Sequence, residues 1–492
     1  MALDNLRDFL GALDARGELV RVERPVAVDK EITEIADRCM KSRGGGPALL
    51  FTRPTLLSGA AARQPVAVNL FGSSARMALA LGVDCLDDIG ERIATLLNLK
   101  VPDSLLGKLA MLPQLAEVAK FPPKTMGGKP PCQEVVLRAD DVDLSQFPVP
   151  VCWPEDGGPY ITLAGVITRD PRTGVRNVGM YRVQVIGRRE LAMHWQRHKV
   201  GAAHWREMAQ RGETMPVAIA LGGDPASIYA ASAPLPPTID EYLFAGFLRK
   251  EPVRLAKAVT SDLEVPAEAE LVLEGHIDPR EELVLEGPFG DHTGFYSLAD
   301  YYPKVHVTAV TMRGEPVWPH TIVGRPPMED YWLGHATERI FLPLLKLTIP
   351  EVVDIHMPAA GIFHNLVFVS IDKQYPGQAY KVMNGLWGQG LMSLAKLIVV
   401  LDKDVNVRDP KEAWWVALNH IDPERDVRFT PGPIDVLDHS SRGFTFGSKM
   451  GIDATRKWKE EGFTREWPNR IVMDPETKRR VDEMWKELGI EL

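Results

Sequence analysis

A series of closely spaced strand-like segments in the middle of the chain constrains the fold more than any other feature. They lie at residues 160–168, 175–186, 191–196, 216–221, 270–276 and 304–312. Turn residues separate several of them, as in the run from Asp170 through Pro171 to Gly174. Many such strands with few helices between them predict a barrel.

The segments on either side of these strands predict two smaller α/β units. Residues 1–120 alternate helix and strand patterns, beginning with a helix that has Asp4 as its candidate cap and ends at Gly17. Residues 121–131 hold so much Pro and Gly that neither element can continue, which predicts a boundary there. Beyond residue 325 the pattern predicts helix 331–346, strands 352–356 and 365–371, helix 377–394, strand 397–401 and a charged terminal helix at 476–487.

Length and charge exclude several classes of protein. A chain of 492 residues exceeds the size at which one core stops growing, so it predicts two or three domains. The net charge of -9 and the pI near 5.8 provide no basic stripe for phosphates, which argues against a nucleic-acid partner. The start of the chain lacks a signal peptide, no run of about 18 apolar residues occurs, and the four cysteines show no CxxC spacing. We therefore expect a cytoplasmic protein with reduced thiols and no transmembrane segment.

The segment from Glu286 to Gly294 places two carboxylates in a predicted loop. Glu286 and Asp291 lie five residues apart, and the Gly and Pro residues between them are unsuited to helix or regular strand. Carboxylates on irregular backbone are often held there for chemistry or for a ligand. A surface turn with solvated acids is an equally good interpretation of this segment alone.

A second segment, residues 175–186, reads as strand and carries Asn177 and Arg182. Their odd spacing sends the two side chains to opposite faces of a strand. One of them could then hold a metal ion while the other reaches an acidic substrate.

Together with five further motifs, these segments resemble the UbiD family of decarboxylases, which use prenylated FMN. The motifs are LRDFL at residues 6–10, EITEIADR at 31–38, CWPED at 152–156, GRPP at 324–327 and GSKMG at 447–451. The ubiquinone-pathway members are the most similar, and the resemblance covers nearly the whole chain. It implies a mixed α+β protein with a small N-terminal α/β domain at 1–120, a central split β-barrel that binds flavin at 121–325, a C-terminal α/β oligomerisation domain at 326–460, and a tail with a terminal helix at 461–492.

Decarboxylation at an sp2 carbon requires a cofactor, because the carbanion is orthogonal to the ring π system and no side chain can delocalise it. The sequence alone leaves that cofactor open: residues 42–46 lack the GK[ST] of a phosphate loop, and no thiamine or Rossmann motif is visible. The resemblance implies prenylated FMN, lined by Met180, Tyr181, Arg182, His194, Trp195, Gln196, Lys199, Val200 and Lys396. Core packing is the alternative role for Trp195 and Met180, and relatives often carry Gly where this chain has Val200.

The resemblance also implies a divalent metal ion held by Asn177, His198 and Glu241. An amide oxygen, an imidazole and a carboxylate suit an octahedral ion such as Mn2+ better than tetrahedral Zn2+. The metal would bridge the protein and the flavin phosphate, and K+ is expected as well. Taken singly, His198 fits a surface histidine and Glu241 fits the first turn of a helix.

Arg182, Glu286 and Asp291 match the family's catalytic arginine and acids. Arg182 suits bidentate pairing with a carboxylate, either the substrate's or that of Glu286. Asp291 is expected to give a proton to the carbon that loses CO2, so it must be protonated at that moment. Glu286 would raise the pKa of Asp291 and Arg182 would lower it, so the two acids could titrate as a unit.

The resemblance implies a non-oxidative, reversible decarboxylase that converts 3-polyprenyl-4-hydroxybenzoate to 2-polyprenylphenol in ubiquinone biosynthesis. A UbiX-type flavin prenyltransferase would supply the cofactor. The chain would form a homo-oligomer, a dimer or a hexamer, in the cytoplasm or peripheral to the inner membrane. Small aromatic, heteroaromatic and α,β-unsaturated acids are alternative substrates, and a flavin carrier without turnover or a metal-dependent hydrolase are alternative classes.

Overall fold

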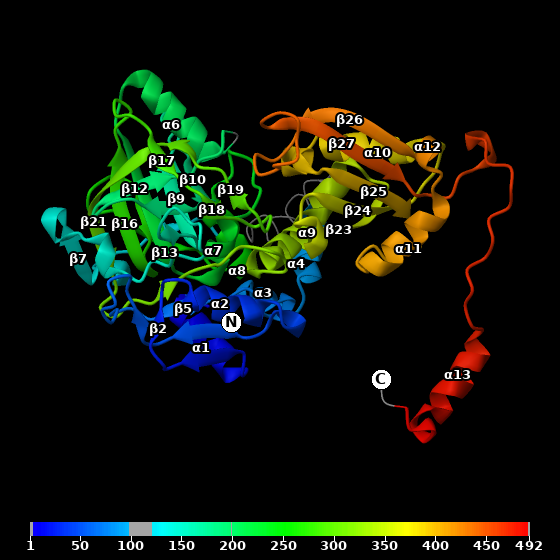
Figure 1. The fold of residues 1–492 in the computed structure, drawn as a ribbon, viewed down its shortest axis with the longest axis horizontal. Helices are drawn as coiled ribbons and strands as arrows, with labels where there is room; N and C mark the ends of the chain where they lie inside the picture. The colour runs from blue at the N-terminus through cyan, green and yellow to red at the C-terminus, as the bar shows by residue number, and fades with distance from the viewer. Residues whose placement is uncertain (1–2, 98–120, 198, 491–492) are drawn as a thin grey trace, which may run out of the picture.

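A curled, open β-sheet forms the largest part of the structure. The computed structural model describes residues 3–97, 121–197 and 199–490. The strands of this sheet are β7 (Val135–Arg138), β8 (Tyr160–Ile161), β9 (Ala164–Arg169), β10 (Arg176–Met180), β11 (Val183–Val185), β12 (Glu190–Met193), β13 (Met215–Gly222), β16 (Ala269–Ile277) and β21 (Lys304–Met312). They run in the order β10-β9-β13-β16-β21-β12-β11-β8, and β7 pairs with β21. Because β10 and β8 stand at opposite ends of this order, the predicted barrel is confirmed as a split one (Figure 1).

Two of the predicted strands are each divided in two. Residues 175–186 form β10 and β11, since β10 pairs with β9 whereas β11 pairs with β8 and β12. The chain crosses between these partners at Tyr181 and Arg182. The expectation that Asn177 and Arg182 share one strand is therefore wrong. Residues 160–168 likewise form β8 and β9.

Both faces of the barrel sheet are covered. All of β13 except Pro216 is buried, and all of β16 except His276. Helix α6 (Val200–Arg211) contacts β9 and β10, and α7 (Pro225–Ala230) packs on α8 (Glu241–Arg249). A sheet that is buried on both faces favours apolar residues at consecutive positions, as in β13. In β16 the buried Glu270 and Glu274 are exceptions, and their carboxylates accept hydrogen bonds from the backbone N of Val317 and Val259.

Short strands flank the barrel, and two pairs of them carry part of the predicted site. β17 (Val284–Glu286) pairs with β20 (Asp300–Tyr302), and β18 (Phe289–Gly290) pairs with β19 (Tyr296–Ser297). The sequence predicted that the whole segment from Glu286 to Gly294 is irregular. That prediction is wrong for its first half, where Glu286, Phe289 and Gly290 pair with neighbouring strands. A separate sheet consists of β6 (Lys124–Thr125), β14 (Arg254–Lys257) and β15 (Glu264–Pro266).

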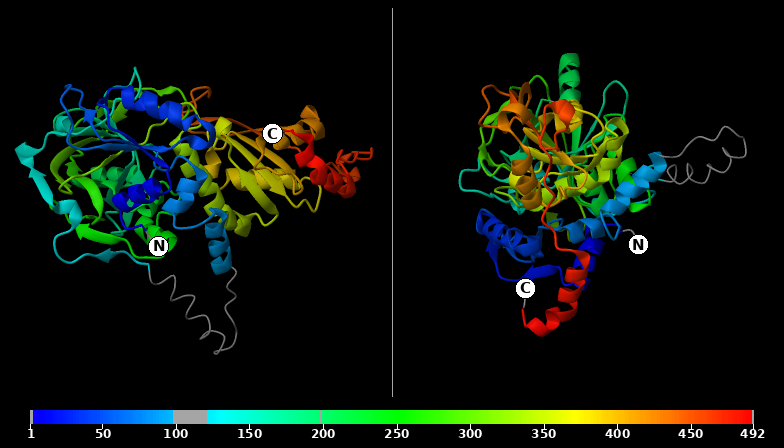
Figure 2. Two further views of the ribbon diagram at one scale, coloured as in Figure 1. Left: turned by 90° about the horizontal axis from the view of Figure 1, so that it is seen from below. Right: turned by 90° about the vertical axis from the view of Figure 1, so that its right-hand side faces the viewer.

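The N-terminal part is an α/β unit whose sheet is completed from far along the chain. Its sheet runs β1 (Leu19–Val22), β3 (Ala48–Phe51), β5 (Val66–Val68) and β22 (Trp318–Pro319), beside the small pair β2 (Val26–Ala27) and β4 (Pro54–Thr55). Its helices are α1 (Leu6–Ala15), α2 (Glu31–Met40), α3 (Ser74–Ala80) and α4 (Asp87–Leu97), and the prediction for residues 98–118 lies outside the described residues. Asn5, rather than the predicted Asp4, caps α1, because its side chain accepts from the backbone N of Asp8. Since β22 follows the barrel in sequence, backbone hydrogen bonds join this unit to the barrel above it (Figure 2).

The C-terminal part is a second α/β layer, reached through the long helix α9 (Glu329–Thr348). Its sheet runs β23 (Val352–His356), β24 (Leu366–Ile371), β25 (Leu397–Asp402), β27 (Phe446–Asp453) and β26 (Val427–Pro433), with helices α10 (Gln378–Trp387), α11 (Pro410–His420) and α12 (Pro423–Asp426). The helix predicted for 377–394 ends at Trp387, because Gly388 and Gly390 follow and only a 3-10 turn continues. An arm then carries α13 (Pro475–Met484), which buries no residue and stands apart from the body in Figure 1. In the part of the chain that the structure describes, no helix has the length and apolar character needed to cross a membrane.

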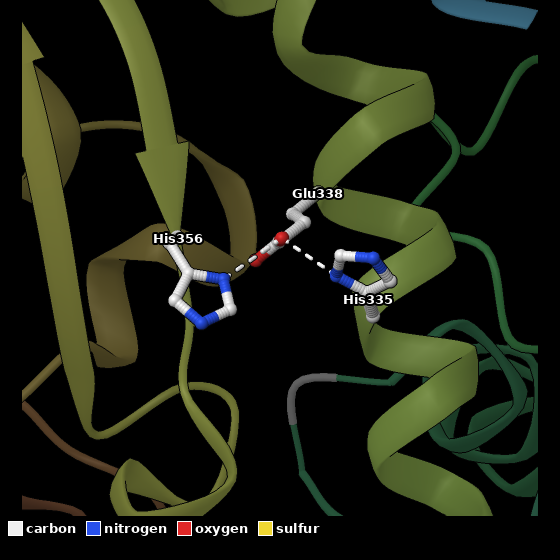
Figure 3. A group of neighbouring side chains, drawn as sticks. All are labelled: His335, Glu338 and His356. Carbon is white, nitrogen blue, oxygen red and sulfur yellow. Dashed lines mark hydrogen bonds and ion pairs between the residues drawn. The ribbon is translucent and has the colours of Figure 1, made fainter. Parts of the chain in front are cut away.

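A buried carboxylate, Glu338, joins α9 to β23 (Figure 3). His335 and His356 each donate from Nδ1 to Glu338 Oε1, at 2.8 Å and 3.1 Å, and the backbone N of Met357 donates to Oε2 at 2.7 Å. Arg339 Nε lies 3.3 Å from Oε1. Histidines and a glutamate are metal-ligand types, but here protein donors occupy both carboxylate oxygens and a guanidinium already supplies the positive charge. We therefore assign the group to holding the helix against the sheet.

The Glu338→Gln variant should be less stable at neutral pH and should lose that difference in acid. Burial raises the pKa of Glu338, but the hydrogen bonds from His335 and His356 outweigh it and bring the pKa to about 2. Because the folded pKa lies below the ordinary value of 4.5, the stabilisation is present above pH 4.5 and is lost as the pH falls toward 2. Thermal unfolding should show a Tm lower by at least about 4 °C at pH 7 and a smaller gap at pH 3.5. A gap that is equal at both pH values, or a similar loss in the exposed control Glu424→Gln, would contradict this assignment.

Candidate active site

Arg182 lies at the centre of a buried cluster of ionised side chains. Its Nε donates to Glu286 Oε1 at 2.8 Å and its Nη2 to Glu286 Oε2 at 3.0 Å, while Nη1 donates to Asp291 Oδ2. Arg182 lies between β10 and β11, Glu286 ends β17, and Asp291 follows β18. The structure therefore brings the three predicted catalytic residues together around one guanidinium.

Neighbouring side chains hold this cluster in one geometry. His194 Nδ1 donates to Glu286 Oε2 at 2.9 Å, and Arg182 Nη2 also donates to Ser297 Oγ at 2.9 Å. The guanidinium carbon lies 4.7 Å from the centre of the Phe289 ring, at cation–π distance. Glu286 is fully buried, and the hydrogen bonds from Arg182 and His194 offset the cost of removing its charge from water.

Histidine hydrogen bonds and the charge of Arg182 together keep both acids ionised. Burial raises the pKa of Glu286, but hydrogen bonds from His194 and Arg182 outweigh it and bring the pKa to about 2. Burial also raises the pKa of Asp291, but the bond from His292 and the charge of Arg182 hold it well below its usual range. Burial and the charge of Arg182 lower the pKa of His194, so that ring is neutral. Of the two opposing effects that the sequence left open for Asp291, the lowering by Arg182 prevails, and the resting residue is a carboxylate.

Tyr181 and Trp195 form a buried aromatic wall beside the cluster. Their ring centres lie 6.2 Å apart at an interplanar angle of 84°. A Cβ on Gly179 would collide with the Tyr181 phenol, and a Cβ on Gly201 would lie 2.7 Å from Trp195 Nε1. Both glycines are thus required by the neighbouring aromatic side chains, a requirement that was not predicted from the sequence. Met180 packs against two hydrophobic clusters, and Gln196 is half-buried at the end of the wall.

Three buried polar atoms along this wall lack a hydrogen-bond partner among the described residues. They are the donors Asn177 Nδ2 and Trp195 Nε1, and His194 Nε2, which is an acceptor because the neutral ring carries its proton on Nδ1. A buried polar atom without a partner costs about 1–3 kcal/mol, so a polar ligand is expected to satisfy such groups. These atoms lie on segments 177–182 and 194–200, where the sequence predicted a flavin, and they fit such a group.

The predicted metal ligands are brought together in part. Asn177 is buried on β10, and Glu241 begins α8 and accepts from the backbone N of Val178 at 2.9 Å. Burial raises the pKa of Glu241 to about 7. A half-buried carboxylate with so little compensating charge fits a cation beside the amide of Asn177. His198 lies outside the described residues.

The residues predicted to bind phosphate lie at two separate places. Lys199 precedes the first turn of α6, which begins at Val200, and burial lowers the pKa of Lys199. A lysine at a helix N-terminus fits an anionic group. Lys396 instead donates to Asp438 at 2.8 Å and to Ser440 at 2.7 Å within the C-terminal layer. Among the described contacts of Lys396, none is with the predicted barrel residues.

Two histidines that were not predicted complete the surroundings of Asp291. His292 Nδ1 donates to Asp291 Oδ1 at 2.9 Å, and His292 Nε2 lies 3.0 Å from His364 Nε2. An imidazole directly after an acid was a visible signal in the loop sequence. His364 gave no signal, because it comes from the C-terminal layer, 72 residues further along the chain.

Comparison with known proteins covers almost the whole chain. The 3-octaprenyl-4-hydroxybenzoate carboxy-lyase family, UbiD, matches in three parts: its N-terminal domain at residues 10–93, its Rift-related domain at 124–326 and its C-terminal domain at 331–454. An uncharacterised protein of Aquifex aeolicus is 53% identical over 487 residues, 99% of each chain. Another, from Archaeoglobus fulgidus, is 49% identical over 490 residues, 99% of each chain.

Solved structures of UbiD-class enzymes have the same fold. HmfF from Pelotomaculum thermopropionicum in complex with FMN is 30% identical, with a TM-score of 0.79 over 96% of this chain and 98% of that one. An evolved dimeric form of HmfF was solved with prenylated FMN, at 29% identity and a TM-score of 0.78 over 97% and 98% of the two chains. Vanillic acid decarboxylase from Sedimentibacter hydroxybenzoicus, in a closed form, is 28% identical, with a TM-score of 0.83 over 100% of both chains. The match along three consecutive domains and the shared architecture agree, and this chain belongs to the UbiD family of carboxy-lyases.

Proposed function

We propose that this chain uses prenylated FMN to remove CO2, non-oxidatively and reversibly, from an aromatic carboxylic acid. The observation that carries the proposal is the buried Arg182, held by two carboxylates beside a wall with unpaired polar atoms. Such a site offers a fixed positive charge for an acidic substrate, and an acid that can hold a proton. Neither a flavin carrier nor a hydrolase requires that combination.

Arg182 is proposed to bind the substrate's carboxylate and to couple that binding to the proton on Asp291. Glu286 occupies Nε and Nη2, so Nη1, which donates to Asp291, is the group left for a substrate. Protonation removes the charge of Asp291 and weakens its hold on Nη1. The substrate carboxylate can then take Nη1 while Asp291 carries the proton that the reacting carbon needs.

Prenylated FMN, when bound, supplies the electron sink that the broken carbon–carbon bond requires. We propose that the segments 180–182 and 194–196 hold its ring, and that Lys199 and the start of α6 at Val200 receive its phosphate. Asn177, His198 and Glu241 are proposed to hold Mn2+ next to that phosphate, with K+ as a further cation. Lys396 is proposed to reach the phosphate only after releasing Asp438 and Ser440.

The first substrate to test is 3-polyprenyl-4-hydroxybenzoate, which would place the enzyme in ubiquinone biosynthesis. The family description, which specifies an octaprenyl-substituted acid, supports it. A small aromatic or heteroaromatic acid is the second candidate, favoured by the likeness to a vanillic acid decarboxylase along the whole chain. We further propose a UbiX-type prenyltransferase as the source of cofactor, and a homo-oligomer in the cytoplasm or at the inner membrane surface.

The cofactor proposal predicts that activity depends on the prenyltransferase. Protein made together with a UbiX-type enzyme should release prenylated FMN, identified by its mass spectrum, and should decarboxylate its substrate. Protein made without it should hold FMN or no flavin and be inactive, because plain FMN lacks the electron sink. Robust decarboxylation by the latter protein would overturn the proposal.

The catalytic proposal predicts that Asp291→Asn keeps its fold, metal and prenylated FMN but loses at least about 100-fold in turnover. An amide can bond to Arg182 but cannot deliver a proton. Exchange of deuterium into the same product carbon should fall in parallel, since it uses the same acid in reverse. The control is Asp300→Asn on β20, an exposed acid of the same region. If the Asp291→Asn variant decarboxylated at near the wild-type rate, the proton donor would lie elsewhere, with Glu286 the first alternative. If the protein were a flavin carrier, neither variant would lose any function.

A further inference from the structure

The C-terminal layer contributes a histidine to the surroundings of the barrel's catalytic acid. His364 Nε2 lies 3.0 Å from Nε2 of His292, whose Nδ1 in turn donates to Asp291 at 2.9 Å. Phe363 lies on the same ring of His292, with centres 5.3 Å apart and planes 29° apart. Phe363 and His364 of the C-terminal layer thus fix the orientation of His292. His292 in turn contacts Asp291 of the barrel.

The backbone that presents these residues is strained. Ile362 and Phe363 have φ angles of 53° and 41°, in the left-handed region that non-glycine residues avoid. Such residues cost on the order of 1–3 kcal/mol each and occur mainly where function requires a special geometry. Gly334 on α9 leaves the space that Phe363 fills, because a Cβ there would lie 3.1 Å from the ring. The space at Gly334, the left-handed turn at Ile362 and the ring of Phe363 together place His364 next to His292.

Asp291 needs a proton source of its own. It is a carboxylate at rest, and decarboxylation consumes one proton per CO2 released. Its side-chain partners are Arg182, His292 and the backbone N of His292. A guanidinium and a peptide N–H do not give up protons at neutral pH, whereas an imidazolium does. Among the described contacts of Asp291, His292 is the one able to reload it.

We propose that His292 holds the proton that reloads Asp291, and that His364 is the positioning residue that keeps it there by accepting the Nε2–H of His292. This inference rests on the proposed decarboxylation. With His292 charged, the buried cluster contains two cations, Arg182 and His292, and two anions, Glu286 and Asp291, and is neutral as a whole. A buried neutral cluster avoids the cost of an uncompensated charge.

The electrostatics of the two rings agree with these roles. Burial lowers the pKa of His292, but the hydrogen bond and charge of Asp291 outweigh it and raise the pKa above its ordinary value. Burial and the neighbouring positive His292 lower the pKa of His364 to about 4, so His364 stays neutral and can accept. The other charged groups that act on the pair are Asp330 and Asp435 on His292, and Asp435 and Lys199 on His364.

The proton balance of one turnover is closed by these residues. The Nδ1 proton of His292 first passes to Asp291. The bond between the substrate carbon and its carboxyl group breaks, CO2 leaves, and the electron pair left behind takes that proton from Asp291, which becomes a carboxylate again. His292 is then neutral, with its remaining Nε2–H donated to His364, and it recovers a proton from water, which restores the resting state.

The test compares His364→Leu, which removes the acceptor, with His364→Gln, whose amide oxygen can replace it. The turnover of the leucine variant at neutral pH should fall about ten- to hundredfold with flavin content unchanged, and the glutamine variant should recover most of it. Since His292 must be charged, kcat falls as the pH rises through its pKa. That falling limb should move to lower pH in His364→Leu by about one to two pH units.

Two further measurements distinguish an effect of packing from an effect on proton supply. They also distinguish failure of this inference from failure of the proposed function. His439→Leu removes another C-terminal histidine that contacts the barrel, at 4.6 Å from the ring of Phe295, and its pH profile should be that of the wild type. In protein free of cofactor, NMR of 15N-labelled histidines should show the His292 titration at lower pH in His364→Leu. An unmoved His292 titration, or equal losses in the leucine and glutamine variants, would overturn the inference even if the wild type decarboxylates. A wild type that lacks activity while the titration moves as expected would overturn the proposed function alone.

Discussion

A charged guanidinium buried between two carboxylates is the interaction on which the arrangement of the barrel's edge depends. Arg182 is almost completely buried, and Glu286 is fully so. Either charge alone would cost several kcal/mol to remove from water, and only their mutual attraction with further hydrogen bonds offsets that cost. The crossing between β10 and β11, the end of β17 and the turn after β18 must therefore meet at one point.

The same cluster relates the barrel to the C-terminal layer. Asp291 lies on the barrel, but His292 beside it is held by Phe363 and His364 of the following domain. The buried network of Glu338, His335 and His356 fixes α9 to β23, and so fixes the sheet that precedes the strained turn at Ile362. The junction and the site thus share α9, which carries Glu338 at the junction and Gly334 beside the Phe363 ring. The α9 junction needs no metal ion for this role, since its carboxylate oxygens are already paired.

Local pattern predicted much of the fold and little of the site. β21 and β23 have the predicted bounds, because clear turn residues delimit apolar runs there. The division of residues 175–186 was missed, because it depends on which distant strands pair with each half. Arg182, Glu286 and Asp291 were recognised through family resemblance, since spacing alone allowed a solvated turn. His364 could not be found at all, because a contact across 72 residues and two domains leaves no periodic signal.

One bidentate, permanently charged group organises both acids, and the Arg182→Lys variant probes this arrangement. Lysine keeps the charge but, as a compact ammonium, cannot hold Glu286 in a fork and Asp291 at the same time. The decarboxylation rate of the cofactor-loaded variant should be measured together with its prenylated FMN content. We expect a flavin content near that of the wild type and a rate lower by at least about 100-fold. A lysine variant that decarboxylates at nearly the wild-type rate would contradict this expectation.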